Sequence, residues 1–298
     1  MKHLLKLEGM PSAAMEEILA STEVIKAKRG GGEAKPLDGQ TWAMIFTKSS
    51  TRTRVSFEVG IRELGGSVMF LNANDMQLGR GEPIKDTARV LGRMVHGAVI
   101  RTFAQADVEE FAEYSGIPTI NALTDDEHPC QILTDIFTFQ ERRGPIRGKV
   151  VTYVGDGGCN VPVSWVYAAA ALDFELRIAA PSEFQPSAET LAKAGGNISC
   201  TQDIRAAVKG ADMVYTDVWV SMGMEAEAEE RLAKLAGYQI NGGLMCLAKP
   251  DALVMHCLPA YRGKEIDAET FEAHADTIFT QAENRLHTQK AILAWLAG

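Results

Sequence analysis

The sequence predicts an α/β protein of two domains with parallel, doubly wound sheets. From Thr41 onward, short apolar runs rich in Val, Ile, Met and Phe alternate with longer segments of helical periodicity, the pattern of strands joined by helices into parallel sheets. A length of 298 residues favours two domains of ordinary size. After Gly144-Pro145 the alternation restarts with a Gly-rich turn between a strand and a helix, so we place the domain boundary near residue 140.

The first half should contain two well-marked helices. Apolar residues recur at helical spacing over 82–95, where Pro83 suits the first turn. A strand over 98–103 follows. The second helix is predicted over 128–143, and a Gly-Pro pair ends it.

The second half repeats the alternation of strands and helices. A strand begins at Lys149, and further strands are expected near Leu176, Met213 and Val254. The last helix is predicted over 281–296, and its leucines lie on one side. We therefore expect it to pack against the protein.

Composition excludes several classes of function. The formal net charge of -9 argues against a surface built for nucleic acid or anionic membrane. The five cysteines lack the paired spacing of a zinc site, so we expect neither a metal nor disulfides. The N-terminal segment has no uninterrupted apolar core like that of a signal peptide, and no run approaches membrane-spanning length. A cytoplasmic protein is expected.

Residues 46–58, FTKSSTRTRVSFE, place hydroxyl groups and arginines where an apolar strand gives way to a helix. Free backbone N–H groups and the positive end of the helix dipole favour an anion at such a junction. The candidate phosphate ligands are Ser50, Thr51, Arg52, Thr53 and Arg54. Arg52 and Arg54 point to different faces, so one should lie over the phosphate while the other braces the loop. The alternative is a solvated helix start.

Three further polar residues of the first half are candidates for the same site. Arg101 closes a strand, and the carboxyl ends of strands form the ligand crevice of open sheets. It either reaches the anion or forms a salt bridge at the rim. His128 and Gln131, in HPCQ, can donate to a carbonyl oxygen, although a histidine at a helix start is more often a cap or a surface residue.

The second half offers an amino acid site. GDGG at 155–158 lacks the GxGxxG spacing, so no nicotinamide cofactor is expected. Asn160 either binds a ligand or caps the next helix. In DVWVSMG, Asp217 suits an ammonium group, and the backbone N–H groups of Ser221 and Gly223 suit a carboxylate.

Two motifs near the C-terminus have simpler interpretations. Cys257, in MHCLP, is expected to be buried and inert, with His256 facing the opposite way as its neighbour on a strand. We therefore propose no thiol nucleophile. For AENRLH, with Asn284 and Arg285, the simplest interpretation is a solvated helix start.

Taken in order, these motifs resemble those of the aspartate/ornithine carbamoyltransferase family, and within it those of the ornithine carbamoyltransferases. They are STRTR (50–54), IKDTARVLGRM (84–94), HPCQ (128–131), DVWVSMG (217–223), HCLP (256–259) and AENRLH (282–287). The resemblance implies two α/β domains linked by two helices. Residues 1–140 with 281–298 would bind carbamoyl phosphate, and residues 141–280 would bind ornithine. It also implies trimers or multiples of trimers, in which Gln77 of a neighbouring subunit completes each site.

The resemblance assigns a role to each motif residue. The carbamoyl phosphate ligands it implies are Ser50, Thr51, Arg52, Thr53, Gln77, Arg101, His128, Gln131, Cys257, the Leu258 carbonyl and Arg285. The ornithine ligands it implies are Asn160, Asp217, Ser221 and Met222. The neutral δ-amine attacks the carbonyl carbon and phosphate leaves. Arg101, His128 and Thr53 are expected to stabilise the oxyanion, with Cys257 beside it.

Two residues depart from the family pattern. Cys159 stands where asparagine is common, and Cys130 replaces a small residue or threonine within HPxQ. Cys159 bears on recognition of the ornithine carboxylate. Two alternatives stay open: transfer to another acceptor, such as putrescine, aspartate or an acylated ornithine, and a non-catalytic metabolite sensor.

Overall fold

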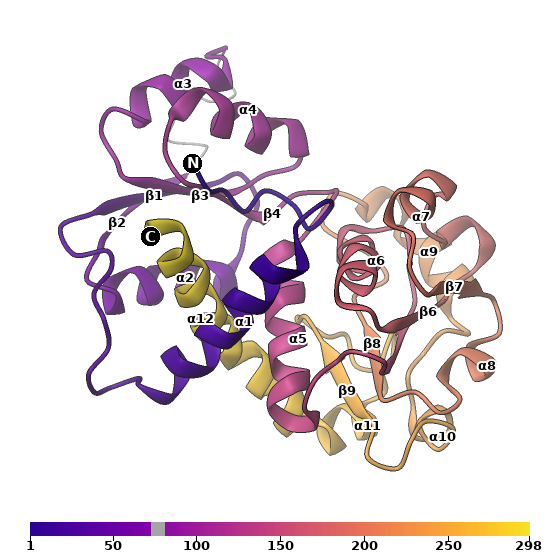
Figure 1. The fold of residues 1–298 in the computed structure, drawn as a ribbon. Coiled ribbons are helices and arrows are strands. Elements are labelled where there is room, and N and C mark those ends of the chain that lie inside the picture. The colour runs from indigo at the N-terminus through magenta and orange to yellow at the C-terminus, as the bar shows by residue number, and fades with distance from the viewer. Residues whose placement is uncertain (73–80) are drawn as a thin grey trace. The chain divides into compact units, whose positions relative to one another are not determined.

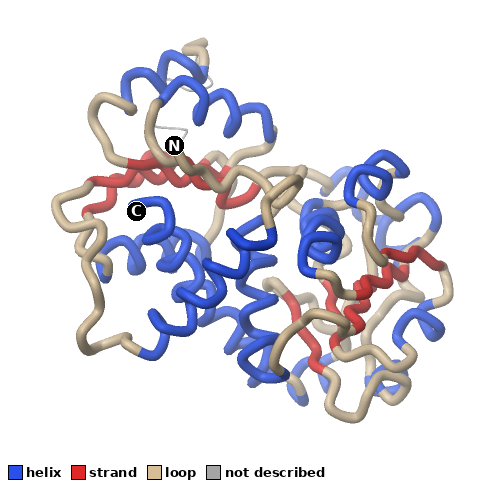
Figure 2. The backbone as a smooth tube through the Cα atoms, in the orientation of Figure 1, coloured by secondary structure: helices blue, strands red, loops and turns tan. Residues whose placement is uncertain are grey.

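The computed structural model describes residues 1–72 and 81–298 and divides into two compact units. Unit 1 comprises residues 1–137 and 283–298, and unit 2 comprises residues 138–282 (Figure 1). Each unit holds one parallel sheet flanked by helices (Figure 2), so the predicted α/β class is confirmed. Two long helices, α5 (Pro129–Arg143) and α12 (Ala275–Ala297), contribute residues to both units.

Unit 1 contains a four-stranded sheet in the order β2-β1-β3-β4. Its strands are β1 (Thr41–Phe46), β2 (Ser67–Asn72), β3 (Gly97–Arg101) and β4 (Thr119–Leu123). Its remaining helices are α1 (Ser12–Ala27), α2 (Thr51–Glu63), α3 (Ile84–Leu91) and α4 (Gln105–Ser115). Helices α3 and α4 cover one face of the sheet, and α1, α2 and the C-terminal part of α12 lie on the other (Figure 1). Apolar side chains such as Ile45, Ile100 and Phe111 fill the layer beneath α3 and α4.

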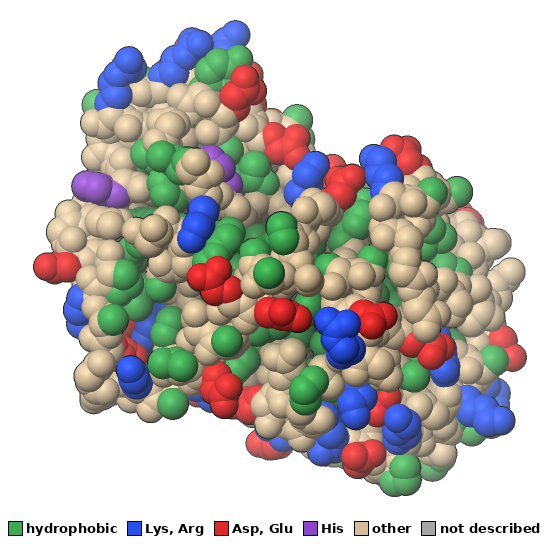
Figure 3. Space-filling model, in the orientation of Figure 1, with side chains coloured by type: hydrophobic (Ala, Val, Ile, Leu, Met, Phe, Trp, Pro, Cys, Tyr) green, Lys and Arg blue, Asp and Glu red, His purple; other side chains and the backbone are tan. Residues whose placement is uncertain are grey.

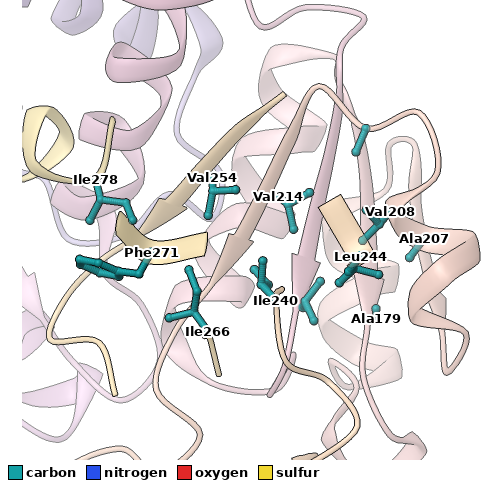
Figure 4. Packing of buried hydrophobic residues seen from close by; sticks show 12 residues of the cluster. Ala179, Ala207, Val208, Val214, Ile240, Leu244, Val254, Ile266, Phe271 and Ile278 are labelled. Carbon is teal, nitrogen blue, oxygen red and sulfur yellow. The ribbon is translucent and has the colours of Figure 1, made fainter. Parts of the chain in front are cut away.

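Unit 2 contains a five-stranded sheet in the order β7-β6-β5-β8-β9. Its strands are β5 (Val150–Val154), β6 (Glu175–Ala179), β7 (Ile198–Thr201), β8 (Met213–Thr216) and β9 (Leu253–His256). Its α-helices are α6 (Asn160–Leu172), α7 (Ala188–Ala194), α8 (Ile204–Val208), α9 (Ala228–Leu235), α10 (Gly242–Met245) and α11 (Ala268–Ala273). Two 3-10 turns are η2 (Ser182–Phe184) and η3 (Glu225–Glu227). Buried residues including Val214, Val254 and Phe271 form the core on one face of the sheet (Figure 4).

The observed elements differ from the predicted ones at their ends. The helix predicted over 82–95 spans only Ile84–Leu91, because the chain leaves it at Gly92. A Cβ at Gly92 would lie 1.8 Å from the Ser115 carbonyl oxygen, so the close approach of α3 to α4 requires glycine there. The last helix begins at Ala275, six residues before the predicted start at 281. The helix predicted over 128–143 is confirmed.

The chain order defines where each unit can hold a ligand. In unit 1 the chain runs from β1 outward to β2 and then crosses to β3 on the other side of β1. In unit 2 it runs from β5 outward through β6 and β7 and then crosses to β8. Ligands of open α/β sheets bind outside the carboxyl ends of the strands at such reversals. The loops after β1 and β3, and those after β5 and β8, are therefore the expected sites.

Surface charge and helix length bear on two classes of protein that composition argues against: those that bind nucleic acid or anionic membrane, and those that span a membrane. On the face shown in Figure 3, Lys and Arg side chains are interspersed with Asp and Glu. None of the helices in the described ranges has the length and apolar content needed to cross a membrane.

Candidate functional site

The carboxyl end of β1 leads directly into the candidate anion site. Ser50 caps helix α2, and its Oγ accepts a hydrogen bond from the Thr53 backbone N–H at 3.2 Å. A cavity of about 420 Å³ opens at this helix end, and Ser50 and Thr51 line it together with Lys48 and Arg54. Hydroxyl groups, a helix N-terminus and two cations therefore converge on one space, as an oxyanion requires.

The two arginines of STRTR take different positions. The Arg54 guanidinium lies 3.7 Å from the centre of the Phe70 ring and lines the cavity. Arg52 is half-buried and is not among the residues that line it. The expectation that they face different ways is met, whereas the phosphate contact predicted for Arg52 stays a prediction.

Lys48 is a cation of this site that sequence analysis did not single out. It is 6% exposed, forms an ion pair with Asp125, and its ammonium group lies 4.2 Å from the centre of the Phe103 ring. The sequence feature that could have indicated Lys48 is its position within the same run as the candidate phosphate ligands, FTKSSTRTR. Burial of a lysine beside the cavity adds positive charge where water screens it little.

Helix α12 brings Arg285 to Thr53. The guanidinium Nη2 donates to Thr53 Oγ1 at 2.6 Å, and Arg285 is 3% exposed. Asn284 is fully buried, and its Oδ1 accepts from Lys26 Nζ at 2.8 Å. The interpretation of AENRLH as a solvated helix start is therefore wrong, because α12 begins at Ala275 and both Asn284 and Arg285 are buried within unit 1.

His128, Arg101 and Arg285 are all buried in unit 1, and the two arginines act on the charge state of the histidine. Burial, and then the positive charges of Arg285 and Arg101, hold the pKa of His128 well below its usual value. The imidazole is therefore neutral, and it can donate one N–H without carrying charge. Arg101 is 6% exposed at the end of β3.

Gln131 and Cys130 occupy the first turn of α5 beside His128. Gln131 is fully buried and donates from Nε2 to Asp135 at 2.9 Å, while its Oε1 has no partner among the described residues. Burial raises the pKa of Cys130 to about 12, and its thiol donates to the Asn121 carbonyl at 3.4 Å. The departure from the family pattern at residue 130 is therefore an unreactive packing residue. Gln77 lies outside the described residues.

Unit 2 gathers an acid and a thiol at the carboxyl edge of its sheet. Asp217 follows β8, Cys257 follows β9, and the Cys257 Sγ donates to Asp217 Oδ1 at 2.7 Å. Burial raises the pKa of Asp217, although the nearby His256 ring and the hydrogen bonds from Cys257 and from the Val218 N–H oppose it. An ammonium group at this carboxylate would replace the missing solvation.

The side chain of His256 does not face away from Cys257 as expected. Ligand atoms of Asp217, His256 and Cys257 all lie within 4.8 Å of one another. Strand alternation fails here because β9 ends at His256 and the chain turns at Cys257. These are the side chains, among those described, that come close enough to hold a metal, but each already makes a hydrogen bond within the protein. The expectation of no metal stays a prediction.

The SMG loop presents a backbone N–H that already holds a carboxylate. The Gly223 N–H donates to both carboxylate oxygens of Glu225 at 3.1 Å. Ser221 is half-buried beside it, and Met222 is 47% exposed. Asn160 begins helix α6 rather than capping it, since Cys159 occupies the cap position.

Arg231 of α9 holds the SMG loop to the turn after β5. Its Nε donates to the Trp219 carbonyl at 2.8 Å, and its Nη2 forms a buried ion pair with Asp156. The guanidinium also lies over the Phe184 ring. Both of these loops leave the sheet at the reversal between β5 and β8, so Arg231 and Asp156 set the distance between them.

The chain matches the carbamoyl-P binding domain of the aspartate/ornithine carbamoyltransferase family over residues 2–141 and its Asp/Orn binding domain over residues 147–296. The chain belongs to this family. An ornithine carbamoyltransferase from Akkermansia muciniphila is 54% identical over 300 residues, covering 100% of this chain and 98% of that relative. One from Methylococcus capsulatus is 50% identical, covering 99% and 98%.

Solved structures of this carbamoyltransferase family share the fold. The ornithine carbamoyltransferase from Pyrococcus furiosus superimposes with a TM-score of 0.94 at 44% identity, covering 100% of this chain and 97% of that one. The anabolic ornithine carbamoyltransferase from Campylobacter jejuni does so with a TM-score of 0.92 at 42% identity, covering 99% of each.

Proposed function

We propose that this carbamoyltransferase transfers the carbamoyl group of carbamoyl phosphate to the δ-amine of L-ornithine, which yields citrulline and phosphate. The observation that carries the choice of acceptor is that unit 2 offers two complementary groups. One is a buried carboxylate, Asp217, and the other is the backbone N–H of Gly223, which already donates to the carboxylate of Glu225. An amino acid presents both complementary charges. Relatives about 50% identical over the full length are named ornithine carbamoyltransferase.

Unit 1 is proposed to bind carbamoyl phosphate. Its proposed ligands are Ser50, Thr51, Arg52, Thr53, Arg101, His128, Gln131 and Arg285. The family resemblance adds Cys257 and the Leu258 carbonyl as proposed ligands of the same substrate. Buried donors hold their geometry before the reaction, so they stabilise the oxyanion without reorganising. Arg101, neutral His128 and Thr53 take this role, and the leaving phosphate accepts the amine proton.

Unit 2 is proposed to bind ornithine through Asn160, Asp217, Ser221 and Met222. We further propose that the enzyme acts in the cytoplasm in arginine biosynthesis, as a homotrimer in which Gln77 of a neighbouring subunit completes each site. Sedimentation and the activity of a diluted sample test the assembly, because a monomer should be nearly inactive.

Acceptor specificity decides between the proposal and its rivals. Turnover with carbamoyl phosphate should be much higher on ornithine than on putrescine, aspartate or acylated ornithine. Putrescine lacks the carboxylate for Gly223, and aspartate would place a second carboxylate near Asp217. Faster turnover on another acceptor would reassign the enzyme, and tight binding of carbamoyl phosphate without any citrulline would make it a sensor.

Activity should rise with pH above neutrality. Ornithine attacks as the neutral amine, whose conjugate acid has a pKa of about 10, so the reactive fraction grows roughly tenfold per pH unit below that value. The lowered pKa of His128 keeps it neutral in this range, so it adds no second ionisation. The measurement is kcat/KM for ornithine from pH 6.5 to 9.5, and a flat profile would contradict direct attack by the amine.

Glu225→Gln should lower the KM for ornithine a few-fold with little change in kcat. Hydrogen bonds from its own backbone N–H and from Gly223 lower the pKa of Glu225, so it stays ionised and competes with the substrate carboxylate. The matched control is Glu229→Gln, a nearby exposed carboxylate on α9. Equal KM values for the two variants would show that Gly223 does not bind ornithine.

A further inference from the structure

A buried histidine lies beneath the turn that follows β9. His256 is fully buried, and its Nδ1 accepts a hydrogen bond from the Leu258 backbone N–H at 2.9 Å. A ring nitrogen that accepts carries no proton, so the proton of the neutral imidazole lies on Nε2. Nε2 lies 3.2 Å from Glu265 Oε1 and donates to it. Both ring nitrogens are therefore committed, and the tautomer is determined.

Glu265 ties together the two ends of the same loop. It is fully buried, and its Oε1 also accepts from the Tyr261 backbone N–H at 2.5 Å. Residues 261–264 above it are exposed. One carboxylate oxygen thus holds the loop at Tyr261 directly and at Leu258 through His256. Its other oxygen, Oε2, has no partner in the described parts of the chain.

Leu258 adopts a backbone conformation that needs this support. Its φ of 60° lies in the left-handed region, one of two such non-glycine residues among those described. Leucine rarely takes this conformation unless the surroundings hold it there. Leu258 directly follows Cys257, whose thiol donates to Asp217. A change in the Leu258 torsion would therefore alter the position of the thiol that bonds to the acid proposed to receive the substrate amine.

We propose that His256 and Glu265 are positioning residues for carbamoyl transfer. Glu265 orients the imidazole of His256, and His256 holds Leu258 in the left-handed conformation that places Cys257 and Asp217 for the amine. The inference rests on the proposed function, since it concerns turnover of ornithine. Both side chains are fully buried and bond to each other and to the loop backbone, so their effect should appear in kcat and not in affinity for carbamoyl phosphate.

Two substitutions at His256 separate its two hydrogen bonds. His256→Asn places an amide oxygen near the position of Nδ1 and keeps the acceptor for Leu258. His256→Gln places an amide nitrogen near Nε2, so it keeps the donor to Glu265 and loses that acceptor. We expect kcat to fall on the order of a hundredfold in the Gln variant, the scale of a misplacement of about 1 Å. The Asn variant should stay within about tenfold of the wild type, with the KM for carbamoyl phosphate unchanged in both.

A second pair of substitutions, one conservative and one that removes the carboxylate, tests Glu265. Glu265→Gln keeps an oxygen for Tyr261 and His256, and its amide nitrogen takes the place of Oε2, which holds no partner. It should retain most of kcat, whereas Glu265→Ala should lose as much as His256→Gln. Urea unfolding of all four variants measures stability separately.

The outcomes distinguish the inference from the function on which it rests. If wild-type protein makes no citrulline, the proposed function fails and the variants are not compared. If the wild type is active and His256→Asn and His256→Gln have equal kcat, or if kcat simply follows the loss of stability, His256 is only a packing residue and the inference is overturned. A rise in the KM for carbamoyl phosphate with kcat unchanged would also overturn it.

Discussion

Arg101→Met is expected to lower kcat for citrulline formation a hundredfold or more. Arg101 is 6% exposed at the carboxyl end of β3, and its charge contributes to the lowered pKa of His128. Its guanidinium is therefore held in a poorly hydrated region before substrate binds. Loss of one such preorganised donor to an oxyanion costs about 100- to 1,000-fold in kcat. Steady-state citrulline production measures the change.

The control for this variant is Arg62→Met. Arg62 is an exposed arginine of α2 in the same unit, and it pairs with Glu58. It should leave kcat unchanged. A second readout is the pKa of His128 by NMR, which should rise in Arg101→Met because one of the charges that lowers it is gone. A kcat within threefold of the wild type would show that Arg101 is not one of the proposed oxyanion donors.

Lys290→Met is expected to destabilise the protein by about 3 kcal/mol, the lower end of the range for breaking a buried ion pair. Lys290 is fully buried on α12, and its Nζ lies 2.6 Å from Glu33 Oε1 and 2.8 Å from Glu63 Oε2. The ammonium group joins α12 to α2 and to the loop after α1. Its removal leaves two carboxylates in a region with little water, although Glu63 keeps its ion pair with Arg29. Urea unfolding measures the loss.

The pH dependence of this loss has a definite sign. Burial alone would raise the pKa of Glu63, but the hydrogen bonds from Lys290 and Arg29 outweigh it and hold the value below normal. The stabilisation is present above the unfolded pKa of about 4.3 and is lost as the pH falls through the lower folded value. The gap between variant and wild type should therefore narrow below about pH 4. Lys28→Met, at an exposed lysine, is the control, and an equal loss there would contradict the argument.

Local pattern in the sequence was enough for the fold class, and it supplied most of the candidate site residues. Hydrophobic alternation predicted parallel strands joined by helices, because buried strands of a parallel sheet require continuous apolar runs. Ser50 was singled out as a candidate phosphate ligand because a hydroxyl before a helix lies at free N–H groups, and in the structure its side chain caps α2 there. Lys48 and Glu265 were not singled out, because burial and partners distant in the chain give each its position.

By itself, the sequence determined the α/β class, the positions of most elements and the set of motifs that identifies the family, since these depend on periodicity and on residues close together in the chain. Only the tertiary structure decided that Arg285 of AENRLH is buried against Thr53, that the side chain of His256 lies near Cys257, and that the Gly223 N–H bonds to Glu225. The physical reason is that burial, hydrogen-bond partners and the resulting pKa values arise from atoms brought together by packing. Spacing along the chain does not record them.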